Sequence, residues 1–354
     1  MSLHADALPL QRPGPSRLYV VDFSGWKRPV VRQCFPQVRL FFVRSVADVP
    51  EGETALVWGR CGDNQDVRRA VRLLRVEDGF LRSVGLGVDL IRPMSWVVDG
   101  RGTHYDAAQV SDLEHVLSTQ QFDAPIRERA ARLRARIAAE GLTKYNVGTG
   151  SWRRPARAGR VILVPGQVET DASLLAYGAP GLRTNLSLLK AVRQANPEAY
   201  VIYKPHPDVL VGLRAKGTKE DEAGQWCDEM VMDVSMASLL DAVDEVHVMT
   251  SLTGFEALLR GKKVTCYGQP FYAGWGLTSD VVPHPRRSRR LTLDELVAGA
   301  LIEYPRYFSR DGESLLPPER ALDELLAWRA STGGVTPWWR KAFRVVLRGV
   351  VGVR

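Results

Sequence analysis

Residues 247–276 read HVMTSLTGFEALLRGKKVTCYGQPFYAGWG, and this stretch decides the fold. It begins as an apolar strand, breaks at a Thr-Ser pair, and continues as a helix-forming run over 255–260 that a glycine ends. A second short strand over 263–267 follows. A strand that leads into a helix start presents unpaired backbone N–H groups, which bind anions. In the alternative interpretation, Ser251 or Thr253 merely caps an ordinary strand-turn-helix unit.

The composition predicts a cytoplasmic protein with two domains. A chain of 354 residues can bury two medium-sized cores, and 45% hydrophobic with 25% charged residues is typical of globular proteins. No signal-peptide pattern starts the sequence, and no apolar run approaches the ~18 residues that a membrane span needs. A disulfide framework or zinc site is not expected, because no Cys-x-x-Cys pair occurs among Cys34, Cys61, Cys227 and Cys266.

The net charge of +8 predicts an acidic partner: nucleic acid, anionic lipid or an acidic sugar. Nucleic acid is disfavoured, since the sequence has no zinc-finger spacing, RNP-like strand or recognition-helix pattern. The tail, residues 338–354 (WWRKAFRVVLRGVVGVR), carries five cationic residues and no acid. Its paired tryptophans and alternating basic and apolar positions favour a helix on an anionic membrane surface. A last helix packed on the protein body is the alternative.

Two series of short apolar runs, each alternating with polar or helical segments, predict an α/β fold with mainly parallel sheets. The expected strands lie near 18–21, 38–43, 54–58, 73–76, 94–99, 161–165 and 200–203, with a further strand-helix step over 231–240. The expected helices lie within 107–140 (divided by Pro125), 185–194, 293–301 and 318–329. Residues 144–160 are the predicted linker, and the predicted domains are 1–155, 156–285 and a C-terminal helical part, 286–354.

Two adjacent acids and a glycine, EDG at 77–79, end the strand near 73–76. Ligands of open α/β sheets bind at the carboxyl edge of the strands, where these side chains are expected. Asp78 or Glu77 is therefore a candidate nucleophile or base, and Arg82 a candidate anion clamp. An acidic turn that is solvated or caps a helix is the alternative.

A histidine between two prolines follows the strand near 200–203, in the sequence KPHPD at 204–208. The flanking prolines hold His206 in a rigid, non-helical turn at the end of a strand. A lone histidine is usually structural, but this placement beside Lys204 favours a functional role.

Four separated motifs together resemble the KpsC/LipA family of capsule polysaccharide proteins, which are bacterial β-Kdo (3-deoxy-manno-oct-2-ulosonic acid) glycosyltransferases. They are EDGFLRSVGLG (77–87), PGQVETDAS (165–173), YKPHPD (203–208) and TSLTGFEALLRGKKVTCYGQPFYAGWGLT (250–278). The resemblance implies a GT-B-like fold of two Rossmann-type domains that face a cleft, followed by C-terminal helices. It also implies CMP-Kdo as donor, held by the C-terminal domain, and a Kdo-containing glycolipid or polysaccharide acceptor. Full-length KpsC resembles two fused transferase modules, whereas this chain has room for one.

The resemblance also implies roles for individual residues. A β-linked donor and product mean retention, which by double displacement requires a carboxylate nucleophile; Asp78 is the first candidate, with Glu77 as the alternative or as acid/base partner. The phosphate is expected to meet positive groups rather than Mg²⁺, with no cofactor. The expected donor-binding residues are Lys204, His206, Arg82, Gln167, Glu169, Ser251, Thr253, Gly254, Gln269 and, on the ribose, Glu256.

Two other functions stay open at this point. The protein could be a non-catalytic module that binds a Kdo-glycolipid for polysaccharide export, with the basic tail as its main functional element. It could also be a transferase for the related donor CMP-sialic acid. The paired acids favour an enzyme over a binding module, and a comparison of donors would separate the two enzymes.

Overall fold

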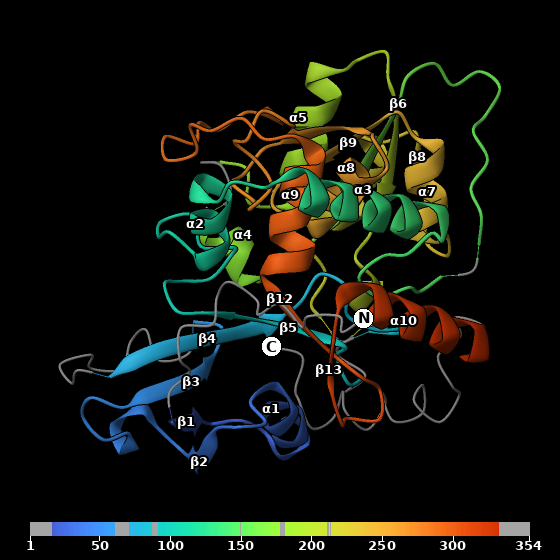
Figure 1. Cartoon of the computed structure of the whole chain (residues 1–354). Helices are drawn as coiled ribbons and strands as arrows, with labels where there is room; N and C mark the ends of the chain where they lie inside the picture. Colours follow the sequence, from blue (N-terminus) through green and yellow to red (C-terminus); the bar gives the residue numbers. More distant parts are fainter. Residues whose placement is uncertain are drawn as a thin grey trace.

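The computed structural model describes residues 16–60, 71–86, 91–148, 150–177, 181–210, 212 and 214–332. The chain forms two α/β halves, each built on one sheet, and the first sheet lies below the second in Figure 1. Strands and helices alternate through most of both halves. The predicted α/β fold, with two domains that face a cleft, is confirmed.

The first sheet contains seven strands in the order β13-β12-β5-β4-β3-β1-β2. Strands β2, β1, β3 and β4 are parallel. Strand β5 runs antiparallel to β4, β12 antiparallel to β5, and β13 antiparallel to β12. The direction of strand succession reverses between β1 and β3, which makes this pair a topological switch point. The strands are β1 (Arg17–Val21), β2 (Arg39–Val43), β3 (Thr54–Trp58), β4 (Arg72–Asp78), β5 (Ser95–Asp99), β12 (Pro305–Phe308) and β13 (Leu315–Leu316).

The second sheet contains six parallel strands in the order β11-β10-β9-β6-β7-β8. Read from β8, this is the 3-2-1-4-5-6 order of nucleotide-binding Rossmann folds, with its switch point between β6 and β9. Every residue of β6 and β9 is buried, as expected for parallel strands that are covered on both faces. The strands are β6 (Val161–Pro165), β7 (Tyr200–Lys204), β8 (Glu229–Met230), β9 (Glu245–Val248), β10 (Lys263–Cys266) and β11 (Ser279–Asp280).

Local sequence signals account for the main helix boundaries. The predicted division at Pro125 is confirmed: α2 ends at Thr119, and the Asp123 side chain accepts a hydrogen bond from the Ile126 N–H (3.0 Å) at the start of α3. The helices are α1 (Arg28–Cys34), α2 (Asp112–Thr119), α3 (Ala124–Ala139), α4 (Ala172–Tyr177), α5 (Asn185–Ala195), α6 (Pro207–Leu210), α7 (Met236–Ala242), α8 (Leu252–Leu259), α9 (Leu293–Val297) and α10 (Pro318–Thr332), with a π-helical segment, η5 (Ala298–Glu303).

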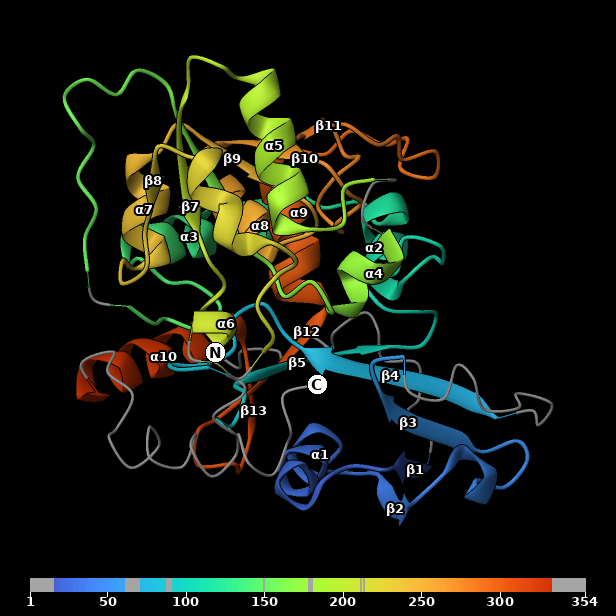
Figure 2. The ribbon, with the colours of Figure 1, turned by 180° about the vertical axis from the view of Figure 1, so that it is seen from behind.

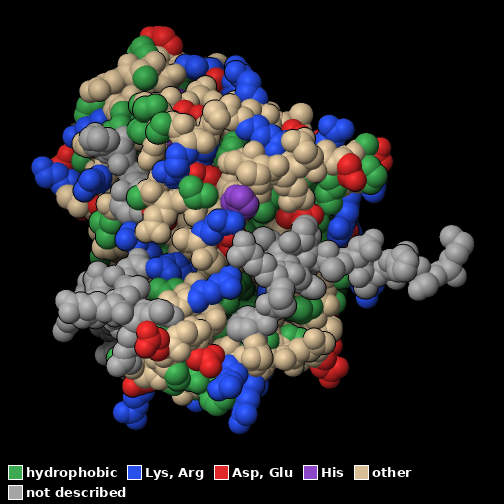
Figure 3. Space-filling view, turned by 60° about the vertical axis from the view of Figure 1, so that its left-hand side comes forward, with side chains coloured by type: hydrophobic (Ala, Val, Ile, Leu, Met, Phe, Trp, Pro, Cys, Tyr) green, Lys and Arg blue, Asp and Glu red, His purple; other side chains and the backbone are tan. Residues whose placement is uncertain are grey.

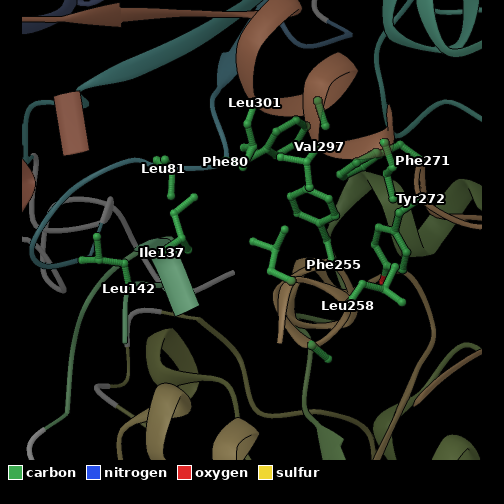
Figure 4. Close-up of a cluster of buried hydrophobic side chains, with 14 of the residues drawn as sticks. Phe80, Leu81, Ile137, Leu142, Phe255, Leu258, Phe271, Tyr272, Val297 and Leu301 are labelled. Atoms are coloured by element: carbon green, nitrogen blue, oxygen red, sulfur yellow. The ribbon is translucent and has the colours of Figure 1, made fainter. Parts of the chain in front are cut away.

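One continuous hydrophobic cluster joins the two halves. Figure 4 shows side chains that follow β4 meeting side chains of α3, α8, α9 and η5, among them Phe80, Leu81, Ile137, Phe255, Leu258, Val297 and Leu301. Helix α3 packs against α8 and α9, and β12 returns to the first sheet. The predicted domain limits stay predictions, but the stretch after 286, expected to be helical, also supplies two strands.

None of the helices in the described ranges combines the length and the hydrophobicity that a bilayer crossing requires. The basic tail, residues 338–354, lies outside the described residues.

Candidate functional site

A cleft of about 1170 Å³ lies between the two halves. On one side its walls include the segment after β1, the end of β3, and the end of β4 with the residues that follow it. On the other side they include the segments at the ends of β6, β7 and β9. Figure 2 shows α4 and α6, which carry lining residues, at the edge of the second half that faces the first sheet. Lys and Arg side chains gather across the middle of the face shown in Figure 3. Because residues next to both switch points line this cleft, it lies at the position where α/β sheets bind ligands.

Asp78, the last residue of β4, lines the cleft with one carboxylate oxygen engaged and one without a partner. Its Oδ2 accepts a hydrogen bond from Arg82 Nε (2.6 Å), and Arg82 is 2% exposed. Its Oδ1 is buried and has no hydrogen-bond partner among the described residues. Because leaving a buried polar atom unpaired is costly, such an atom in a cleft points to a role with a ligand.

Glu77 lines the same cleft, but its surroundings differ from those of Asp78. Successive residues of a strand point to opposite faces, so the two carboxyl groups reach the cleft from different sides of β4. Glu77 Oε1 accepts a hydrogen bond from the Tyr105 hydroxyl (3.0 Å). Burial, followed by the charge of Asp78, raises the pKa of Glu77 to about 7. A carboxyl group with this pKa can both accept and donate a proton near neutral pH.

Gly59 makes room for the Glu77 carboxyl group. It follows β3 with φ +57°, and a Cβ atom there would lie 2.6 Å from Glu77 Oε1. Any other residue would therefore displace the carboxylate as well as strain the backbone.

Lys204 ends β7 and His206 follows it, and both line the opposite wall. The Asp208 N–H donates a hydrogen bond to His206 Nδ1 (3.1 Å), and burial lowers the pKa of this histidine. The imidazole is therefore neutral near pH 7 with its proton on Nε2, which is left as a donor. Lys204 is 8% exposed and donates from Nζ to the Met232 carbonyl oxygen (3.2 Å). The pair offers hydrogen-bond donors and positive charge to an anion.

The switch point between β6 and β9 is held by a reciprocal side-chain contact. Gln167 Oε1 accepts from the Thr250 N–H (2.9 Å), and Gln167 Nε2 donates to Thr250 Oγ1 (3.0 Å). Ser251 then caps α8, because its hydroxyl oxygen accepts from the Thr253 N–H (3.3 Å). Gln167, Ser251 and Thr253 all line the cleft, and the N-terminal end of α8 faces it.

Four further predicted donor-binding residues make contacts with other parts of the protein. Glu256 and Gln269 line the cleft, where Glu256 Oε1 accepts from the Lys144 N–H (2.7 Å) and Gln269 Nε2 donates to the Pro283 carbonyl oxygen (2.9 Å). Glu169 and Gly254 do not line it. The Glu169 carboxylate accepts hydrogen bonds from the backbone N–H groups of Asn185, which begins α5, and of Thr218. A Cβ atom on Gly254 would collide with the Tyr272 ring. The donor-binding roles of all four stay predictions.

The cleft residues that sequence reasoning missed include Lys27, Trp58, Tyr105 and Lys144. Lys27 follows β1 and Trp58 ends β3, so the carboxyl-edge rule applied to these two strands would have found both residues. Lys144 begins the predicted linker, but its carbonyl oxygen accepts from the N–H groups of Arg82 and Ser83 (both 3.2 Å). No sequence signal marks Tyr105. Across the described part of the chain, His, Cys, Asp and Glu side chains form no group of three suited to a metal ion.

Comparison with known sequences places the chain among capsule proteins. The sequence model of a family described as "Capsule polysaccharide biosynthesis protein" matches residues 143–307. The capsule polysaccharide modification protein LipA of Neisseria meningitidis serogroup A is 47% identical over 320 residues, which cover 87% of this chain and 45% of LipA. The lipopolysaccharide-processing protein LpsZ of Rhizobium meliloti is 42% identical over 325 residues, covering 86% of this chain and 73% of LpsZ. The chain thus spans about half the length of LipA.

Two solved structures have the same fold over nearly their whole length. Thermosulfurimonas dismutans KpsC, described as a β-Kdo 2,7 transferase, has a TM-score of 0.75 and 41% identity, covering 88% of this chain and 99% of its own. A second KpsC structure of that organism, described as a β-Kdo 2,4 transferase, has a TM-score of 0.73 and 30% identity, with 87% and 97% covered. With this identity over nearly all of the solved chain and most of LpsZ, the protein belongs to the KpsC/LipA family of capsule polysaccharide proteins.

Proposed function

We propose that this protein is a retaining glycosyltransferase that moves Kdo from CMP-Kdo to a Kdo-containing acceptor in the biosynthesis of a capsule or related surface polysaccharide. The observation that carries the proposal is the pair of unlike acids in the cleft. Asp78 faces the guanidinium of Arg82 and keeps one oxygen unpartnered, whereas the pKa of Glu77 is raised to about 7. The similarity to KpsC structures described as Kdo transferases supports the sugar assignment.

In the first step of the proposed reaction, Asp78 is the nucleophile. Its carboxylate attacks the anomeric carbon of Kdo, and the bond from that carbon to the phosphate oxygen breaks. CMP leaves with the electron pair, and a Kdo ester of Asp78 remains. The departing phosphate gains negative charge, which we expect the His206 Nε2–H, the Lys204 ammonium and the start of α8, all of which line the cleft, to stabilise.

In the second step, Glu77 acts as the base. It removes the proton from the acceptor hydroxyl while the acceptor oxygen attacks the anomeric carbon and releases Asp78. Two successive inversions give net retention, as in retaining glycosidases. Tyr105 orients the Glu77 carboxyl group through the 3.0 Å hydrogen bond.

The test is incubation of the purified protein with CMP-Kdo and a synthetic Kdo-terminated acceptor, followed by mass spectrometry. The proposal expects the acceptor to gain one Kdo while CMP is released, and expects the Asp78→Asn variant to do neither. If the protein transferred sugar from CMP-sialic acid but not from CMP-Kdo, CMP-sialic acid would become the proposed donor. CMP binding without transfer from either donor would contradict the donor or acceptor assignment, and no CMP binding at all would favour a glycolipid-binding module.

We also propose a cytoplasmic location with peripheral attachment to the membrane through the basic tail. The support is the composition of residues 338–354, in which five cationic side chains accompany two adjacent tryptophans. An acceptor that carries a lipid would then be met at the membrane surface.

A further inference from the structure

Lys27 places a cation in the cleft that has no oxygen partner in the described part of the chain. It ends the short 3₁₀ turn Gly25–Lys27 that follows β1. Its Nζ lies 3.1 Å from the centroid of the Trp58 ring and 5.6 Å from that of Trp26. Trp58 ends β3, so the first switch point brings the ammonium and the indole together.

The described residues leave part of the hydrogen-bonding capacity of this ammonium group open to the cleft. It carries three N–H donors, and contact with an aromatic face engages only part of this capacity. Burial lowers the pKa of Lys27, although the charges of Asp78 and Glu77 oppose the shift. Neither acid lies within ion-pair distance, so a structural salt bridge does not explain the lysine. Lys204, by contrast, donates to a carbonyl oxygen of the protein.

We propose that Lys27 and Trp58 form the subsite for the terminal acidic sugar of the acceptor. The ammonium binds the sugar carboxylate, and the indole packs against the apolar face of the sugar ring. This inference rests on the proposed function in one respect, namely that a sugar acceptor enters the cleft from the side of the first sheet. The acceptor hydroxyl then approaches next to Glu77, the proposed base.

The position of Lys27 favours the acceptor over the donor. The start of α8, which follows the β6–β9 switch point, is the proposed phosphate site, so the nucleotide is expected on the opposite wall. In Kdo the carboxylate is attached to the anomeric carbon, so the donor carboxylate must lie close to the carbon that Asp78 attacks. Lys144, which also lines the cleft, contacts the donor half as well as the first half, because Glu256 of α8 accepts a hydrogen bond from its N–H. Lys27 lies on the first-sheet wall, where it can meet a second anionic sugar.

Lys190 provides a matched control outside the cleft. Its Nζ lies 5.2 Å from the centroid of the Trp226 ring, so it repeats the lysine–tryptophan contact without lining the cleft. The experiment compares the wild type, Lys27→Met and Lys190→Met. In the presence of CMP, each protein is titrated calorimetrically with the methyl glycoside of Kdo and with its carboxamide.

We expect the wild type and Lys190→Met to bind the carboxylate more tightly than the carboxamide by roughly 10- to 100-fold, as for a hydrogen bond between charged groups. Lys27→Met should bind both ligands alike, with unchanged affinity for CMP. An undiminished carboxylate preference in Lys27→Met, or no preference in the wild type, would overturn the subsite. Weakened CMP binding in Lys27→Met would also overturn the subsite, because it would assign Lys27 to donor binding instead.

These binding measurements separate the subsite from the proposed reaction. A carboxylate preference that depends on Lys27 supports the subsite even if CMP-Kdo gives no transfer, an outcome that would overturn only the proposed reaction.

Discussion

Replacing Glu77 with glutamine should stabilise the protein at alkaline pH while abolishing transfer. Burial and the charge of Asp78 raise the pKa of Glu77 from 4.5 to about 7. Because the folded-state pKa is the higher one, the protonated carboxyl group favours the folded protein below about pH 4.5, and this contribution is lost as the pH rises through 7. Each unit of difference between the folded and unfolded pKa of Glu77 changes the free energy of unfolding by about 1.4 kcal/mol. The ionised carboxylate therefore lowers the free energy of unfolding by roughly 3 kcal/mol.

The Glu77→Gln variant keeps an oxygen that can accept the Tyr105 hydroxyl and cannot ionise. Its advantage over the wild type in free energy of unfolding should therefore grow by roughly 2 to 3 kcal/mol between about pH 5 and about pH 8. Urea unfolding followed by circular dichroism at both pH values measures this difference. Glu51→Gln, at an exposed turn, is the matched control and should show no such growth. The same advantage for Glu77→Gln at both pH values would refute the reasoning, because Glu77 would then ionise alike in the folded and unfolded chains.

Three further predictions concern Asp78, Glu256 and the basic tail. Asp78→Asn should lower kcat by roughly 10⁴-fold with CMP affinity retained, as measured by transfer assay and calorimetry, and substantial residual activity would remove Asp78 as nucleophile. Glu256→Ala should lower kcat whereas Glu256→Gln, which keeps an acceptor for the Lys144 N–H, should retain most of it; weakened CMP binding in both variants would instead support the ribose role. Deletion of residues 338–354 should reduce binding to anionic vesicles in a salt-dependent way, and unchanged co-sedimentation would speak against membrane attachment.

Much of the fold could be predicted from the sequence because its signals are local. The apolar run of β6 identified a buried strand, and Pro125 marked the start of α3. The carboxyl-edge rule needs only a strand and the residues that follow it, so the sequence alone is enough to predict that Asp78 and His206 line a cleft. Their catalytic roles stay predictions that the proposed assays test.

The tertiary structure decided what depends on contacts between distant segments. Hydrophobic periodicity does not specify which strand pairs with which, so the return of β12 to the first sheet could not be inferred from the sequence. The partners of Glu169 are also set by the tertiary structure: the sequence predicted this residue in the cleft, whereas its carboxylate binds the backbone N–H groups at the start of α5 and at Thr218.

In the candidate site, too, the sequence determined some features and the tertiary structure determined others. The sequence determined that two acids end one strand and that a lysine and a histidine end another. Only the tertiary structure set the surroundings that distinguish Glu77 from Asp78: the Tyr105 hydroxyl, 28 positions along the chain, and the burial that raises one pKa. The convergence of Lys27 and Trp58 is likewise tertiary. Protonation and ligand binding depend on desolvation and on charges across the cleft, and these are fixed only when the two halves pack together.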